Sequence, residues 1–190
     1  MNQESLAFKD GSVNTLVICT GFHDSRLTED FLGHLGSKSV KLRSYIIISP
    51  FSCLNEAFLP GEDLTLIGFS AGVVNAIALA YYWQAQGVKI RALMALDGWG
   101  VPLIGNFPIY RLSHDYFTHW SSCLLGSGQE NFYADPPVDH LSLWSSPDRV
   151  TGWSINGNFV QRTTALTFLS KIWVKTPSFY DGFKLQWKKR

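Results

Sequence analysis

Four short runs of apolar residues, many of them β-branched, recur along the first half of the chain, and helical patterns lie between them. The runs cover residues 15–19, 45–49, 64–67 and 90–96. Gly21 follows the first run and Pro50 the second. Continuous apolar runs bounded by Gly or Pro are typical of interior strands of a parallel sheet, which are buried on both faces. Helix signals at residues 28–35 and 71–86 alternate with the runs, so the pattern predicts an α/β fold with right-handed crossovers.

Residues 98–128 differ in composition from the segments before them. They contain Pro102 and Pro108, several glycines and a dense set of aromatic side chains. We interpret this segment as a short lid or insert within a single domain over residues 1–190, with a helix over about 115–125.

The last third of the chain is predicted to complete the sheet and to end in a helix. Residues 131–134 indicate a last short strand, which Pro136 ends. We interpret residues 151–158 as a turn-rich linker and residues 158–174 as a closing amphipathic helix. The whole pattern predicts a compact α/β domain with flanking helices and a mainly parallel sheet of about five to six strands.

Composition excludes several classes of protein. The 190 residues are 46% hydrophobic, 14% aromatic and only 16% charged, which is the opposite of a disordered chain. Sixteen Lys and Arg against fifteen Asp and Glu leave a formal net charge of +1. A protein without a positive field gains little from counterion release on nucleic acid, so we expect no nucleic-acid partner. The composition excludes a solvated acidic module as well.

The cysteines and the N-terminus indicate an intracellular setting. Cys19, Cys53 and Cys123 form an odd set without a CxxC pair, which argues against a zinc ribbon or a disulfide framework and favours reduced thiols. Residues 1–5 lack the features of a signal peptide, and the apolar stretches are shorter or more interrupted than the roughly 20 residues of a membrane span. We therefore expect a soluble cytoplasmic protein without a membrane span. The sequence leaves its oligomeric state open.

The segment 64–72 carries the strongest chemical signal. A buried strand is followed by Gly68-Phe69-Ser70-Ala71-Gly72, a G-x-S-x-G motif, and then by a long helix. A serine on such a strained turn projects its hydroxyl above the sheet, and glycines without Cβ atoms let neighbouring elements approach the turn. The amide of Ala71, at the start of the helix, is the expected first donor to an oxyanion. The alternative is an ordinary helix-opening turn.

A serine nucleophile needs a base, and the base needs an orienting acid. Asp97 directly follows the run at 90–96, at the carboxyl end of a parallel strand, where catalytic groups collect. His140 lies just after the strand predicted at 131–134, and we predict it to be the base. The alternatives are a turn-capping Asp97 and a surface histidine at 140, with His114 and His119 as competing bases.

Other residues are predicted to surround the serine. The loop after the first strand, at Gly21, is expected to supply a second oxyanion donor from the amide of Phe22 or of His23, although it could equally be a plain strand–helix turn. Aromatic side chains would wall a substrate site, although dense aromatics are more often core packing. The predicted substrate-binding residues are His23, Trp99, Phe107, Tyr116 and His119.

Together, the motif at 68–72, the glycine turn at Gly21, Asp97 and His140 resemble the α/β-hydrolase superfamily, in which serine, acid and histidine follow in that chain order. The acid at the very next strand is similar to the thioesterase domains of peptide and polyketide synthases. The resemblance extends from residue 16 to about residue 172 and rests on one specific motif. Members of the family are usually longer and have a more elaborate lid.

The resemblance implies a minimal α/β-hydrolase fold with a short lid and a serine hydrolase that cleaves an ester or thioester. Ser70 would form an acyl-enzyme, with His140 as general base and Asp97 as its orienting acid. The expected substrate is a small-molecule acyl ester or thioester, and neither a cofactor nor a metal is expected. One alternative is a catalytically silent member of the fold that serves as a binding protein. Another is a metal-dependent hydrolase that uses His114, Asp115 and His119.

Overall fold

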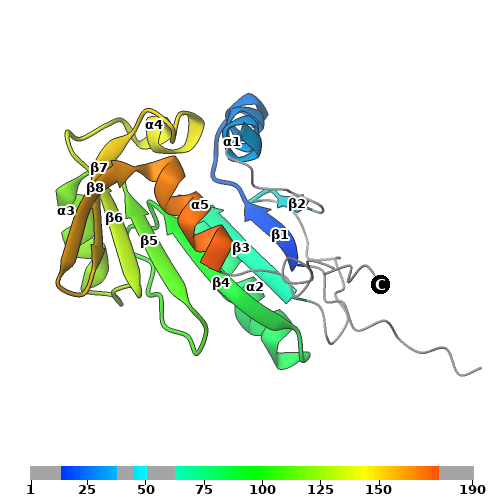
Figure 1. Cartoon of the computed structure of the whole chain (residues 1–190). Helices are drawn as coiled ribbons and strands as arrows, with labels where there is room; N and C mark the ends of the chain where they lie inside the picture. The colour runs from blue at the N-terminus through cyan, green and yellow to red at the C-terminus, as the bar shows by residue number, and fades with distance from the viewer. Residues whose placement is uncertain (1–13, 38–44, 51–62, 176–190) are drawn as a thin grey trace, which may run out of the picture.

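An eight-stranded sheet forms the framework of the part of the chain that the computed structural model describes, residues 14–37, 45–50 and 63–175 (Figure 1). The strand order is β2-β1-β3-β4-β5-β6-β7-β8, with β1 to β6 parallel and the last two strands antiparallel. In chain order the strands are β1 Asn14–Cys19, β2 Tyr45–Ile48, β3 Asp63–Phe69, β4 Lys89–Leu96, β5 Ile109–Ser113, β6 Glu130–Ala134, β7 Thr151–Asn156 and β8 Phe159–Thr164. The predicted α/β class is confirmed, and all four predicted runs form strands. β1 and β3 are interior strands that are buried along their whole length. The prediction of an interior strand at residues 45–49 is wrong, because β2 lies at the edge of the sheet, where β1 alone of the described strands pairs with it, and Tyr45 and Ile47 are exposed.

Helices cover both faces of the sheet. They are α1 Ser25–Ser37, α2 Gly72–Ala85, α3 Tyr116–Cys123, α4 His140–Ser145 and α5 Ala165–Lys175. In Figure 1, α5 lies in front of the sheet and α2 behind it. Alternate residues of the strands accordingly feed two cores, one with α1, α4 and α5 and the other with α2. The two helices α1 and α2 lie on opposite faces because the chain moves in opposite directions along the sheet. From β1 it crosses to β2 toward one edge of the sheet, and from β3 it crosses to β4 toward the other edge. Because both crossovers are right-handed, they place α1 and α2 on opposite faces.

The strand order reverses between β1 and β3. At such a switch point the loops after neighbouring strands leave toward opposite faces, which opens a crevice at the carboxyl ends of the strands. The residues that leave this edge are Gly21 after β1, Ser70 after β3 and Asp97 after β4. All three belong to the motifs predicted to carry chemistry.

The prediction of five to six strands is wrong, because β7 and β8 form a hairpin where we expected a linker and the start of a helix. The loop between them is Gly157 and Asn158, and Gly157 has a φ of 57°, a conformation that suits glycine in a two-residue hairpin turn. The closing helix therefore begins at Ala165 and not at residue 158. A Gly-Asn pair between two runs is a hairpin signal, so this feature was readable from the sequence.

Residues 98–128 are more than a lid or insert. They contain β5, all of whose residues are buried, between β4 and β6 in the sheet. Only the flanking parts, 98–108 and 114–128, lie outside the sheet, and the second includes α3 at the position predicted for a helix. The prolines and glycines that suggested an insert belong to the connections of this strand.

Two of the three cysteines lie in the described residues, and both are free thiols. Burial raises the pKa of Cys19 to about 12, and it also raises the pKa of Cys123. Neither thiol is therefore disposed to act as a thiolate nucleophile. Cys53 lies outside the described residues. No helix in the described ranges is long and apolar enough to cross a membrane.

Candidate active site

Ser70 occupies a sharp turn between β3 and α2. Its φ is 53°, a left-handed conformation that costs a non-glycine residue about 1–3 kcal/mol. The turn is tightened by close packing, because a Cβ on Gly72 would lie 2.2 Å from the carbonyl oxygen of Cys19 and one on Gly68 would lie 2.8 Å from Cα of Val73. Only glycine at these two positions lets α2 begin directly against β1 and β3.

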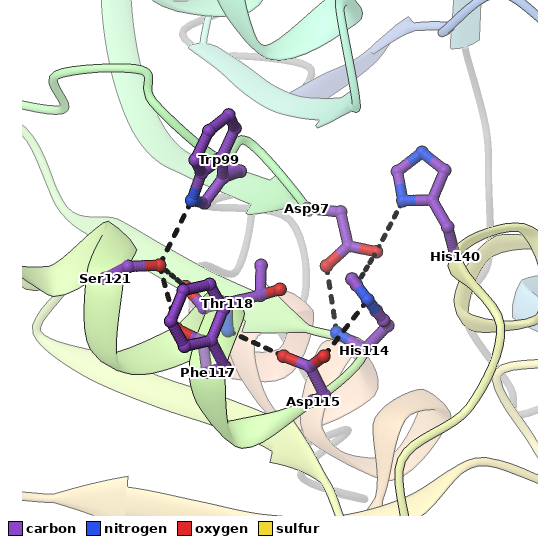
Figure 2. Close-up of polar contacts among 8 residues, drawn as sticks. All are labelled: Asp97, Trp99, His114, Asp115, Phe117, Thr118, Ser121 and His140. Atoms are coloured by element: carbon purple, nitrogen blue, oxygen red, sulfur yellow. Dashed lines mark hydrogen bonds and ion pairs between the residues drawn. The ribbon is translucent and has the colours of Figure 1, made fainter.

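Asp97 also lies in a left-handed turn, at the end of β4. Its φ is 51°, a conformation in which Asp is enriched. The carboxylate is buried, and it accepts three hydrogen bonds, at Oδ2 from Nδ1 of His140 at 2.8 Å and Nδ1 of His114 at 3.0 Å, and at Oδ1 from the backbone amide of His114 at 2.9 Å. Figure 2 shows the carboxylate between the two imidazole rings. Burial works to raise the pKa of Asp97, but these hydrogen bonds outweigh it and lower the pKa, so the group is a carboxylate at neutral pH.

His140 is the first residue of α4 and reaches Asp97 from across the sheet edge. Its ring stacks on Phe69 with centroids 4.7 Å apart, and its side chain is 41% exposed. With Nδ1 bonded to Asp97, Nε2 is the nitrogen not engaged by the carboxylate. An imidazole held in this way has the tautomer and orientation of a general base.

Ser70 and His140 face one cleft of about 490 Å³. Its lining residues are Ser70, Ala71, Val74, Asp97, Trp99, Val101, His114, Phe117, Thr118 and His140. The hydrogen bond of the His140 side chain in this structure goes to Asp97 and not to Ser70. Serine–histidine pairs often tighten only when substrate binds. The cleft thus contains a hydroxyl, an imidazole and a buried carboxylate, which is the set of groups that nucleophilic catalysis by serine requires.

Of the predicted substrate-binding residues, Trp99 alone lines this cleft, and Ala71, the predicted oxyanion donor, lines it too. Phe107 is 6% exposed and packs in the core beside α2, with its ring against Tyr81. Tyr116 and His119 contact the ring of Tyr133 instead, on the far side of α3. The helix α3 presents Phe117 and Thr118 to the cleft. Tyr116 and His119 lie on either side of that pair, so their side chains point in other directions, and we no longer assign them to substrate binding.

Phe22 and His23 lie beside the cleft and not in its lining. Both line a second hollow of about 460 Å³, which is bounded also by Thr28 and Ile47. His23 is hydrogen-bonded within its own segment, from Nδ1 to the carbonyl oxygen of Gly21 at 3.0 Å and between Nε2 and Thr28 Oγ1 at 3.2 Å. Burial lowers its pKa, the charge of Asp24 opposes this, and His140 lowers the pKa further. These contacts give His23 a structural role in shaping the loop.

His114, which the sequence offered only as a competing base or a metal ligand, lies beside Asp97. It follows β5 directly, so the strand hidden in the aromatic segment delivers it to the same edge as Asp97. The sequence did contain a signal for His114, because a histidine that directly follows a buried strand is expected at the edge where the neighbouring strands end. The signal was missed because β5 was not recognised as a strand.

The metal site considered at residues 114, 115 and 119 is not formed, because His119 turns toward Tyr133 and Cys123. The described residues contain a different group of potential ligands, Asp97, His114 and His140, with donor atoms within 4.8 Å of one another. Both Nδ1 atoms lie at hydrogen-bond distance from a single oxygen of Asp97, an arrangement that fits two N–H donors on one carboxylate oxygen.

Comparisons of the chain with protein-family models and with curated proteins find no match.

Proposed function

We propose that this protein is a serine hydrolase of the α/β-hydrolase type, which cleaves an ester or thioester of a small molecule. The observation that carries the proposal is the convergence of three groups distant in sequence on one cleft: Ser70 on a left-handed turn, His140 on α4, and buried Asp97 between them and the sheet. The eight-stranded sheet, with its switch point beside Ser70, supports the same assignment.

In the proposed reaction, Oγ of Ser70 attacks the acyl carbon while its proton passes to Nε2 of His140. The C–O or C–S bond to the leaving group then breaks, and His140 returns the proton to the departing alcohol or thiol. Water attacks the acyl-enzyme, gives a proton to His140 and releases the acid, and the proton goes back to Ser70. Asp97 remains ionised throughout and stabilises the imidazolium, in agreement with its lowered pKa.

Backbone amides would stabilise the tetrahedral oxyanion. Ala71 precedes the first turn of α2, where amides lack partners within the helix and the helix dipole is positive. Gly21 brings the loop after β1 against the nucleophile, since a Cβ there would lie 3.0 Å from Cβ of Ser70. The amide of Phe22, next along that loop, is our second proposed donor. Each such donor is worth about 3 kcal/mol in the transition state.

The cleft favours a neutral, largely apolar acyl group. Val74, Trp99, Val101 and Phe117 form its apolar wall, and its described lining contains no Lys or Arg to hold a phosphate or carboxylate. An acyl chain can bury its methylene groups there, at about 0.8 kcal/mol each. A panel of neutral esters and thioesters of increasing chain length would identify the preferred substrate and leaving group.

We expect an active-site fluorophosphonate probe to label the wild-type protein at one serine. The Ser70→Ala variant should lose this labelling, because the nucleophile itself is removed. Its rate of ester or thioester hydrolysis should fall by about 10³-fold or more. Labelling is followed by intact-protein mass spectrometry. Ser121→Ala is the matched control, since Ser121 lies on α3 beside the cleft and bonds to Trp99, which lines it. Labelling that persists without Ser70, or a folded wild type that is never labelled, would refute the proposal and favour a binding role for this fold.

A further inference from the structure

Asp97 serves two histidines, and the second of them, His114, has no part in the mechanism above. His114 donates its backbone amide to Oδ1 of Asp97 at 2.9 Å, and its ring nitrogen Nδ1 lies 3.0 Å from Oδ2. The oxygen Oδ2 is the same atom that holds His140 at 2.8 Å. The two imidazole rings are nearly perpendicular, with centroids 5.9 Å apart.

Both ring nitrogens of His114 face carboxylates. Nε2 lies 3.3 Å from Oδ2 of Asp115, on the side of the ring opposite Asp97, as Figure 2 shows. A neutral imidazole has only one N–H, so one of its nitrogens would present a lone pair to a negative oxygen. The imidazolium form carries an N–H at each ring nitrogen, so it donates a hydrogen bond to Asp97 and places positive charge next to Asp115. His140 differs, because only its Nδ1 meets a carboxylate.

We propose that His114 is a protonated positioning residue, which fixes Asp97 and partly neutralises the negative charge that supports His140. Loss of the His114 proton would return the full charge of Asp97 to His140 and increase the reactivity of Ser70. This inference rests on the proposed hydrolase function for its effect on Ser70, but the charge of His114 can be measured without it.

The charged groups around His114 favour its protonated form. Asp97 approaches from the end of β4, Asp115 from the start of α3, and Asp139 from the residue before α4, whereas His140 is the one histidine facing it from α4. The hydrogen bond to Asp97 is the main cause that raises the pKa of His114, and partial burial opposes it less strongly. The side chain is 25% exposed, so the proton can exchange with solvent.

The geometry sets the size of the effect. Two unit charges 5.9 Å apart, as the ring centroids are, repel each other in water by an amount equivalent to about a threefold change in rate, and by more where the medium is less polar. A positive His114 therefore slows a step that forms a positive His140 by about threefold or more.

The test is the rate of fluorophosphonate labelling as a function of pH. We expect the ratio of the wild-type rate to the His114→Asn rate to rise at least about threefold above pH 6.5, as His114 loses its proton. His114→Asn retains an amide donor near the position of Nδ1 but carries no charge, so it lacks this step. His34→Asn is the control, because His34 lies on α1, pairs with Asp148 and does not line the cleft; the ratio of its rate to the wild-type rate should not change with pH.

A second measurement addresses His114 directly. In nitrogen-15 spectra of the wild-type protein, both ring nitrogens of His114, identified by the signals missing from His114→Asn, should be protonated at pH 6.5. A neutral ring at that pH would overturn the inference, and so would Ser70-dependent labelling with identical profiles for the wild type and His114→Asn. The failure of the proposed function looks different: the wild type would not be labelled at all, whatever the charge of His114.

Discussion

Asp97 places a buried negative charge at the cleft and accepts a hydrogen bond from each of the two histidines that line it. Its carboxylate is 1% exposed, carries a lowered pKa and joins residues from the end of β4, the end of β5 and the start of α4. A buried carboxylate is costly unless donors surround it, and here the donors are the two histidines. The same bonds that stabilise the charge therefore also hold the candidate base in place.

His114 should make the stability of the fold depend on pH. Because its pKa is raised in the folded state, its contribution to the free energy of unfolding is fully present below pH 6.5 and is lost as the pH rises through the folded pKa. We expect urea midpoints of the wild type to fall between pH 6 and pH 9 more than those of His114→Asn. Other groups titrate in both proteins, so the difference isolates His114. A constant difference across this range would contradict the prediction.

At the scale of the element, the strand–turn–helix unit of β3 and α2 is held by contacts between backbones. Gly72 sits where a Cβ would overlap the carbonyls of Cys19 and Thr20, at 2.2 Å and 2.6 Å. Backbone atoms in the middle of a sheet cannot move aside as a side-chain end can. This contact links the end of β1 to the turn that carries Ser70.

Gly72→Ala should therefore lower the free energy of unfolding by about 3 kcal/mol or more, and it should displace Ser70. The matched control is Gly33→Ala, in α1, where an added Cβ meets nothing within 4 Å. In that exposed helical position alanine should raise stability by about 0.5–1 kcal/mol. Urea denaturation of both variants measures the two effects. Equal stability of the two variants would mean that the close contact is not present in solution.

At the scale of the whole molecule, a stack of aromatic rings connects the helix of His140 to the rest of the fold. Trp144, on α4, stacks on Phe31 of α1 with centroids 3.8 Å apart and on Phe69 of β3 at 5.0 Å. Phe69 in turn carries the ring of His140. The helix α4 is only six residues long, so its place depends on this packing and not on its own stability.

Trp144→Ala should cost about 3–5 kcal/mol of stability and slow fluorophosphonate labelling of Ser70, because α4 loses its support. Trp144→Phe should cost less, since it keeps the stack and removes a buried N–H that has no hydrogen-bond partner. Leu141→Ala, at an exposed position of the same helix, should change neither property appreciably. Thermal melts and labelling rates report the two effects, and full labelling of a folded Trp144→Ala protein would argue against this role.

The sequence by itself determined the features that depend on neighbours along the chain. Apolar runs between glycines and prolines predicted the interior strands β1, β3 and β4, and the order strand, G-x-S-x-G, helix predicted the turn of Ser70. The strands were recognisable because burial on both faces requires continuous apolar residues, whatever lies beside them.

Only the tertiary structure decided which distant groups meet. Asp97 and His140 are 43 residues apart, and nothing local distinguishes His140 from His114 as its partner; the structure gives Asp97 both. In the structure, Trp99 and Phe117 line the cleft, whereas Phe107 packs in the core. The direction in which an aromatic side chain points depends on the elements packed around it, so the sequence could not separate these residues. The residue type determines the chemistry that a side chain can perform, whereas the packing of the sheet and helices determines which other side chains it contacts.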